Sequence, residues 1–416
     1  MNGLDRRGTA TLSFMALWRQ SGTVWFGAVA AAGLALLTQI LLARHLDDET
    51  FGALSNAYAI AILVATFAFQ GLGEVTLRNL AAVDLTRSVV AAGLLLLVGL
   101  VASGAWTSWT GEAGTTPGLL LAFVPFVIVQ AGLTAGMISF QLERRNIGIA
   151  AWPVGFQAAR LAVVGLVVVA GADVIAVPLG WCLLLAPLAW FGLRRMRAAK
   201  KRIDRVPATS TSGIIRAALP FSATRLLEFA EIQLPVVLAM PLLGASETGR
   251  IAACLAIVQG LLLLPISIFQ RLLRASFHDW TRADPARLRR AGLVGAVAMA
   301  VAGAGLGLAI RPFASMILGS IFGEQFTAST GFLESMMLLL PIWFASIAIN
   351  ATLVSPRLAD LRFGCQAVGI LILVTGSFLG GSDTDGIVKG MFASQTFLLL
   401  SGILLATVRR SPATPV

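Results

Sequence analysis

The stretch Leu41–Ile60, LLARHLDDETFGALSNAYAI, places a short polar turn in an otherwise apolar N-terminal region. The run 24–43, which leads into this turn, contains no charged residue. It has the length of roughly 20 residues that an α-helix needs to cross the hydrocarbon core of a bilayer. The runs 89–109 and 291–310 are similarly long and also lack charge. A chain that alternates such runs with short polar turns is predicted to be an all-α membrane protein.

The composition argues against several other classes of protein. Hydrophobic residues make up 57% of the 416 residues and charged residues only 12%, about half of the roughly 25% that is typical of soluble domains. The three cysteines lie within apolar runs, and the two histidines are far apart in the sequence. These positions form neither a disulfide framework nor a ligand-spaced metal site. We therefore expect no metal and no other cofactor.

The hydropathy pattern predicts twelve membrane-spanning helices. The links between them are short, apart from two basic links, 194–216 and 271–290, and none is long enough to hold a soluble domain. The predicted spans are 24–43, 52–73, 89–109, 118–140, 148–170, 174–193, 218–243, 250–270, 291–310, 332–354, 363–380 and 386–408.

The orientation follows from the distribution of lysine and arginine, which favour cytoplasmic loops. With the N-terminus in the cytoplasm, the cytoplasmic segments hold 25 of the 31 basic residues and the opposite segments hold 3. One span too many or too few would move every later link to the opposite side of the membrane. The asymmetry in basic residues therefore also supports the span count. Both termini are predicted to be cytoplasmic. The net charge of +11 then faces the anionic inner leaflet, and no nucleic-acid partner is implied.

The opening stretch has a counterpart later in the chain. Leu238–Ile257, LAMPLLGASETGRIAACLAI, aligns with Leu41–Ile60 and shares five residues with it, including the glycine at Gly52 and Gly249. Each copy links the first two spans of a six-span half, so the halves are predicted to be parallel repeats, although chance similarity in an Ala/Leu-rich sequence is the alternative. The predicted organisation is an N-terminal six-helix lobe at 1–193, a basic cytoplasmic linker at 194–216 and a C-terminal six-helix lobe at 217–416.

The turn at Leu41–Ile60 and the sequence FQGLGEVTLRN after it resemble a known family. They are similar to the oligosaccharide flippases of the multidrug/oligosaccharidyl-lipid/polysaccharide superfamily, whose second helix ends in a Gly-x-Gly-x-x-x-x-Arg pattern. Gly71, Gly73 and Arg78 match this ending, whereas Asp47 stands where the family usually has glycine. In the second half the resemblance continues through a Phe-Gly-Glu-x-Phe link at Phe322–Phe326.

The resemblance implies a transporter rather than an enzyme. Twelve helices in two six-helix lobes would surround a central cavity that opens alternately to either side. The implied substrate is an undecaprenyl-pyrophosphate-linked oligosaccharide, carried from the cytoplasmic to the periplasmic leaflet of the bacterial inner membrane. The product would serve the assembly of O-antigen, capsule or exopolysaccharide. The implied partners are membrane lipid and, downstream, a polysaccharide polymerase and assembly proteins.

Such a substrate needs a cation inside the membrane to offset the charge of its phosphates. Arg160 lies near the middle of the predicted fifth span, with no acidic residue between Ile147 and Gly171. Burying a charge there costs at least ~2.5–3.5 kcal/mol on insertion scales, so an intramembrane arginine indicates a functional role. We predict that Arg160 lines the cavity and binds phosphate. A salt bridge to another helix and a misplaced span stay open as alternatives.

The seventh predicted span carries three charged residues on one helical face, Arg225, Glu228 and Glu231. Arg225 and Glu228 fit a self-neutralised structural pair. The functional interpretation is that Arg225 binds phosphate and a glutamate carries a coupling proton. Glu231 is the first choice for the proton and Glu228 the second. Gln366 and Gln395, within or near later spans, suit sugar hydroxyls or interhelical hydrogen bonds.

Three further arginines lie at the cytoplasmic ends of predicted spans: Arg78, Arg271 and Arg274. They fit a cationic vestibule that collects the substrate, or side chains that simply extend to the membrane surface.

Two other functions compete with flipping. A drug or toxin exporter of the same superfamily would take organic cations, and its cavity would favour carboxylates over arginine. A polysaccharide ligase or polymerase would need a sizeable outer loop with reactive side chains. The longest predicted outer link, 311–331, holds only Arg311 and Glu324 as charged residues, which argues against an enzyme.

Overall fold

The computed structural model describes residues 8–79, 116–143, 145–203, 211–273, 277, 280, 283–353, 356–381 and 383–407. All regular elements among these residues are helices, which confirms the predicted all-α class. Eleven helical segments are long and apolar enough to cross a membrane. They coincide with eleven of the twelve predicted spans, and the predicted third span, 89–109, lies outside the described residues.

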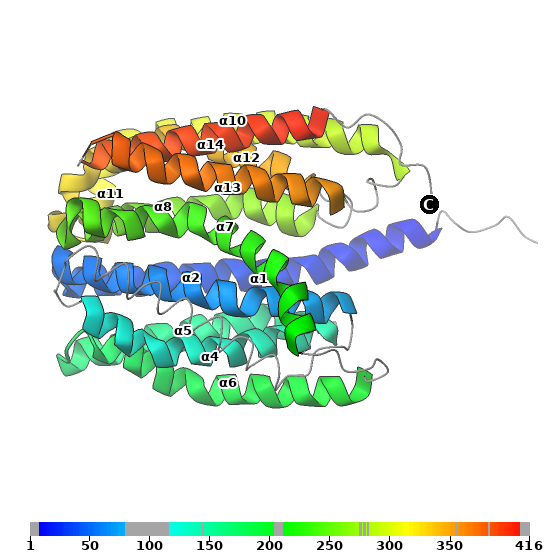
Figure 1. The fold of residues 1–416 in the computed structure, drawn as a ribbon, viewed down its shortest axis with the longest axis horizontal. Coiled ribbons are helices and arrows are strands. Elements are labelled where there is room, and N and C mark those ends of the chain that lie inside the picture. Colours follow the sequence, from blue (N-terminus) through cyan, green and yellow to red (C-terminus); the bar gives the residue numbers. More distant parts are fainter. Residues whose placement is uncertain are drawn as a thin grey trace, which may run out of the picture.

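Five described helices form the group that we call the N-terminal lobe (Figure 1). Within it, α1 packs against α5, α2 against α4, and α6 against both α4 and α5. The helices are α1 (Gly8–His45), α2 (Asp48–Asn79), α4 (Thr116–Leu142), α5 (Asn146–Ala170) and α6 (Ala176–Ile203).

Six long helices form the C-terminal lobe, which repeats this packing scheme. Four pairs of packed helices occupy the same places in the order of spans as the four pairs of the N-terminal lobe. They are α7 with α13, α8 with α12, α12 with α14 and α13 with α14. This correspondence is the result that parallel repeats of one helical unit would produce. The helices are α7 (Thr211–Leu243), α8 (Ala245–Pro265), α10 (Pro285–Ile310), α12 (Thr330–Asn350), α13 (Pro356–Leu379) and α14 (Thr384–Thr407).

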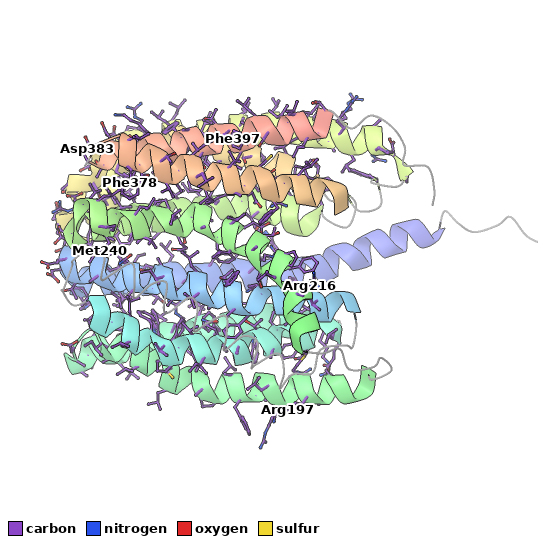
Figure 2. All side chains as sticks on the ribbon, in the orientation of Figure 1. Arg197, Arg216, Met240, Phe378, Asp383 and Phe397 are labelled. Carbon is purple, nitrogen blue, oxygen red and sulfur yellow. The ribbon has the colours of Figure 1, made fainter. Side chains whose placement is uncertain are left out.

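The segment between α6 and α7 is partly helical. The predicted linker 194–216 overlaps the last residues of α6 and the first residues of α7, and its part 204–210 lies outside the described residues. The labelled residues Arg197 and Arg216 lie toward the end of the molecule where α6 ends and α7 begins, whereas Met240 and Asp383 lie at the opposite end (Figure 2). We call that opposite end the outer end, after its predicted orientation.

The predicted outer link 311–331 is largely helical in the structure. It forms the 3-10 turn η2 (Arg311–Phe313), the helix α11 (Ala314–Ile321) and the 3-10 segment η3 (Glu324–Ser329). Phe326 is fully buried, and its ring contacts the ring of Phe51 on α2 at a centroid separation of 5.7 Å. This contact shows that the link packs at the interface between the lobes. It can do so because large apolar side chains lie between its few charged residues.

The helix α8 changes geometry at its inner end. After Pro265 it continues as a π-helix, η1 (Ile266–Leu272), in which the Leu273 amide donates to the Ile268 carbonyl. Proline lacks the amide hydrogen that the α-helical ladder requires, which accounts for a change at this position. The predicted span 250–270 is therefore α-helical only as far as Pro265.

The exposed surface of the long helices is apolar. Leu166 and Val169 on α5, and Val297 and Val301 on α10, are each more than half exposed. Monomeric soluble proteins rarely expose contiguous apolar faces of this kind. These faces suit contact with lipid, as expected for membrane-spanning helices.

The two lobes meet along α2, which packs against both α7 and α8. The repeated glycines lie at this contact. A Cβ on Gly52 would overlap the Ala245 carbonyl, and a Cβ on Gly249 would overlap the Asp48 carbonyl. The shared glycine of the two turns is therefore explained by close approach of two backbones, which only glycine permits.

We expect Gly249→Ala to destabilise the protein by roughly 1–3 kcal/mol, the usual cost of overpacking. The added methyl group would push α8 away from the start of α2. The measurement is the melting temperature of the purified protein in detergent. Gly260→Ala on the same helix is the control, because no neighbouring atom lies within 4 Å of the place that its added Cβ would take. Equal melting temperatures for both variants would contradict the close-contact interpretation.

Candidate substrate and coupling sites

Arg160 lies on α5 inside the N-terminal lobe and is only 3% exposed. Its Nη1 donates to the Tyr58 hydroxyl at 3.0 Å and to Gln157 Oε1 at 3.2 Å. Tyr58 lies on α2, the helix that meets the other lobe. Arg160, the predicted phosphate ligand, is therefore hydrogen-bonded directly to α2, the helix that meets the other lobe.

Aromatic rings surround the Arg160 guanidinium. Its central carbon lies 4.0 Å from the Trp181 ring centroid, 4.7 Å from that of Tyr58 and 5.6 Å from that of Phe156. The Trp181 indole also donates to the Arg160 backbone carbonyl at 3.1 Å. Cation–π attraction stabilises a charge in such a cage without neutralising it. We call Tyr58, Phe156 and Trp181 the aromatic cage.

Arg160 has no carboxylate within ion-pair distance among the residues that the structure describes. Its Nε is buried and has no hydrogen-bond partner there. The salt-bridge alternative is thus not realised among these residues. The guanidinium keeps its full positive charge and an unused donor, a combination that suits an anion. The sequence held one clue to the cage, since Phe156 precedes Arg160 by four residues on the same helix.

The charged face of α7 forms a different kind of cluster in the C-terminal lobe. Glu228 accepts from Arg225 through one carboxylate oxygen and from Arg362 of α13 through the other, both at 2.7 Å. The structural pairing of Arg225 with Glu228 is therefore present, and a third residue joins it. Sequence reasoning missed Arg362, because it lies at the end of a predicted span and was counted with the cytoplasmic charges.

Glu231 lies beside this cluster but makes no ion pair with a described residue. Its polar neighbours include the amides of Gln366 of α13 and Gln395 of α14, which are 4% and 3% exposed. The Oε1 atoms of both glutamines and the Nε of Arg362 are buried without a hydrogen-bond partner in the described structure. An amide can hydrogen-bond either the neutral or the ionised form of a carboxyl group, so this setting can hold Glu231 in both forms.

The three predicted vestibule arginines lie at the inner ends of their elements or outside the described part. Arg78 belongs to the last turn of α2 and Arg271 to the π-helix η1, but their side chains are outside the described residues. Arg274 lies outside the described residues altogether. The vestibule stays a prediction.

Comparison with known proteins relates the fold to transporters. No protein-family model and no curated protein sequence matches the chain. Solved structures do match it over nearly its whole length. The first is a multidrug-resistance MATE family transporter of the MOP superfamily in an inward-facing conformation, with a TM-score of 0.68 at 13% identity, over 93% of this chain and 98% of that chain. The chain has the fold of MOP-superfamily transporters.

Two further matches show the breadth of this fold. The lipid II flippase MurJ, in an inward-closed conformation, matches with a TM-score of 0.65 at 12% identity, over 91% of this chain and 86% of that chain. A eukaryotic MATE transporter matches with a TM-score of 0.61 at 15% identity, over 95% and 97%. The predicted all-α fold of two helical lobes is thus confirmed, with eleven of its twelve predicted spans among the described residues. Drug exporters and a lipid flippase share it, so the choice of substrate depends on the residues of the site.

Proposed function

We propose that the chain is a flippase that moves an undecaprenyl-pyrophosphate-linked oligosaccharide from the cytoplasmic to the periplasmic leaflet by alternating access. The observation that supports this most is Arg160, a caged and buried cation without a described carboxylate partner. A positive charge held in a low-dielectric interior attracts an anionic group and repels an organic cation. The site therefore favours a phosphate-bearing lipid over the cationic cargo of a drug exporter.

Arginine also has the right shape for this role, because its planar fork can bind two phosphate oxygens at once. In the proposed binding step, phosphate oxygens replace the Tyr58 hydroxyl and the Gln157 amide oxygen on Arg160 and take up the unused Nε donor. The Trp181 ring stays against the guanidinium and keeps it oriented. Arg225 is the second candidate for the pyrophosphate, although Glu228 already engages its Nη1.

The inner ends of the helices would collect the substrate. Arg78, Arg271 and Arg274 form the cationic vestibule of this proposal, next to the anionic inner leaflet. Placement in a bacterial inner membrane with both termini cytoplasmic rests on the charge count of the sequence. A polysaccharide polymerase and assembly proteins would then take the lipid-linked product on the far side.

Glu231 is the proposed proton carrier. Glu228 contacts two arginines at 2.7 Å and is therefore held within the structural cluster. Glu231, with two amides and no described ion pair, is free to change its protonation as the lobes move.

The test is transport by the purified protein in liposomes. We expect a lipid-linked oligosaccharide to become accessible in the opposite leaflet, and we expect no efflux of a fluorescent organic cation from the same vesicles. The control is the same liposomes without protein. Cation efflux without lipid translocation would replace this proposal by the drug-exporter alternative.

A further inference from the structure

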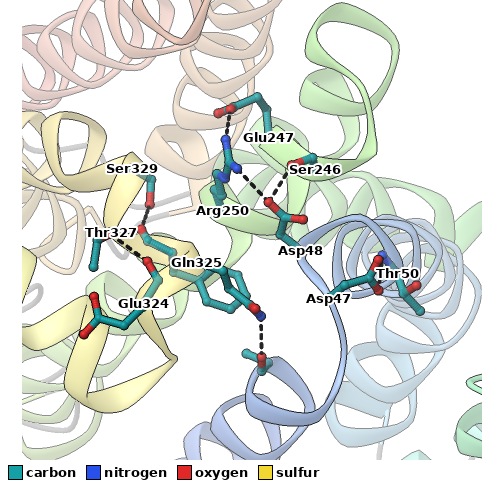
Figure 3. Close-up of polar contacts among 12 residues, drawn as sticks. Asp47, Asp48, Thr50, Ser246, Glu247, Arg250, Glu324, Gln325, Thr327 and Ser329 are labelled. Carbon is teal, nitrogen blue, oxygen red and sulfur yellow. Dashed lines mark hydrogen bonds and ion pairs between the residues drawn. The ribbon is translucent and has the colours of Figure 1, made fainter.

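The two repeated turns meet at the outer end of the molecule, where polar side chains connect the lobes (Figure 3). Asp48 is the first residue of α2, and Ser246, Glu247 and Arg250 occupy the first turns of α8. We call these four residues the outer clasp.

Asp48 provides the bonds that cross between the lobes within the clasp. Its Oδ2 accepts from the Ser246 hydroxyl at 2.6 Å and pairs with Arg250 Nη2 at 2.7 Å. The side chains of Asp48 and Arg250 are 22% and 24% exposed, so water screens this pair only partly.

Further hydrogen bonds connect the two lobes at the outer end, with donors on both lobes. Gln325 of η3 donates from Nε2 to the carbonyls of Ala43 and Leu46, at 3.2 and 3.0 Å. Arg44 of α1 donates from Nε to the Ile321 carbonyl at 2.8 Å. The clasp thus lies within a closed contact between the lobes, and alternating access requires this contact to break.

Arg250 has a second carboxylate partner on its own helix. Its Nη1 pairs with Glu247, three residues earlier on α8, while its Nη2 pairs with Asp48 of the other lobe (Figure 3). The two carboxylates therefore bind different nitrogens of one guanidinium. Only one of these two pairs is lost if the lobes separate.

We propose that Glu247 is a positioning residue that allows the outer clasp to open. When the lobes part, Arg250 loses Asp48 but stays paired with Glu247 on α8. Asp48 in turn stays at the N-terminus of α2, where the exposed amide groups stabilise a negative charge. Each charge of the broken pair keeps a local partner, so opening leaves neither of them isolated.

This arrangement predicts opposite effects for the two carboxylates. Without Asp48, the closed state loses its pair across the lobes, and the open state is favoured. Without Glu247, only the closed state can pair Arg250, and the closed state is favoured. The inference requires a protein that alternates between two conformations, as in the proposed function, but it does not depend on which substrate is carried.

The experiment measures the distance between the lobes at the outer end. Spin labels are attached at Ala172→Cys and Asp385→Cys, two exposed positions on different lobes, after replacement of the three native cysteines. Pulsed electron paramagnetic resonance then gives the populations of short and long distances. We expect Asp48→Asn to raise the ratio of open to closed molecules, and Glu247→Gln to lower it, each about two- to fivefold, the range for a partly exposed ion pair.

Glu49→Gln, an exposed neighbour of Asp48, is the matched control and should leave the distances unchanged. Melting temperatures show that each variant is folded, and Glu247→Ala provides a second variant that should shift the distances as Glu247→Gln does. An unchanged distribution in both Glu247 variants, or a shift in the same direction as Asp48→Asn, would overturn the proposal. A failure to transport lipid-linked oligosaccharide would overturn the proposed function. It would not overturn the proposed role of Glu247, because the distances are measured without substrate.

Discussion

Arg160→Ala is expected to abolish complementation in a host that lacks its own polysaccharide flippase. The variant removes the guanidinium that the aromatic cage surrounds, so the phosphate loses its counter-charge inside the membrane. Truncating one partner of a buried, hydrogen-bonded charge pair typically costs 2–5 kcal/mol, so we expect transport in liposomes to fall on the order of 30-fold or more.

Loss of transport must be separated from loss of folding. Arg160→Met fills the cage with a flexible apolar side chain and should remain inserted while being equally inactive. Arg160→Lys keeps the charge but not the planar fork, so partial activity is expected. Membrane levels and melting temperatures accompany each assay. Full transport in a well-folded Arg160→Met protein would exclude Arg160 as the phosphate ligand.

The positions of the spans followed from the sequence because each span needs its own long apolar run. The charge count supported them, since it assigned 25 of the 31 basic residues to one side of the membrane and only Arg44, Arg250 and Arg311 to the other. The repeated glycine was also visible as a pattern. Its cause was not, because the overlap of Gly52 with Ala245 depends on two segments that are almost 200 residues apart.

The partners of the site residues were harder to predict. Periodicity placed Arg225 and Glu228 on one face of a helix and so predicted their pair. It could not show that Arg362 completes this cluster from α13, or that Trp181 covers Arg160 from α6. Such contacts depend on how helices are arranged around one another, which the pattern of a single helix does not contain.

The contacts of the opening turn also depend on how the helices are arranged around one another. From the sequence alone, this turn was a polar link between two spans and one copy of a repeat. In the structure Asp48 meets Ser246 and Arg250 at the repeated turn of the other lobe. The repeat itself brings these residues together, because equivalent turns of two parallel repeats lie at the same end of the molecule.

Glu231→Gln is expected to uncouple transport from the proton gradient. Glutamine resembles the protonated carboxyl group in size and polarity but cannot release a proton, so the variant should still equilibrate lipid-linked oligosaccharide between leaflets. It should no longer concentrate the lipid in the outer leaflet when a pH gradient is imposed. The measurement compares the final distribution between leaflets with and without a gradient, in vesicles that contain the parent protein or the variant.

Glu228→Gln on the same helix is the matched control. This carboxylate binds Arg225 and Arg362 at once, so its loss should lower stability by about 1–3 kcal/mol. The two variants therefore separate a coupling role from a structural one on a single face of α7. If Glu231→Gln retains the full response to the pH gradient, Glu231 is not the proton carrier, and repeating the assay with a sodium gradient would show whether another ion drives the cycle.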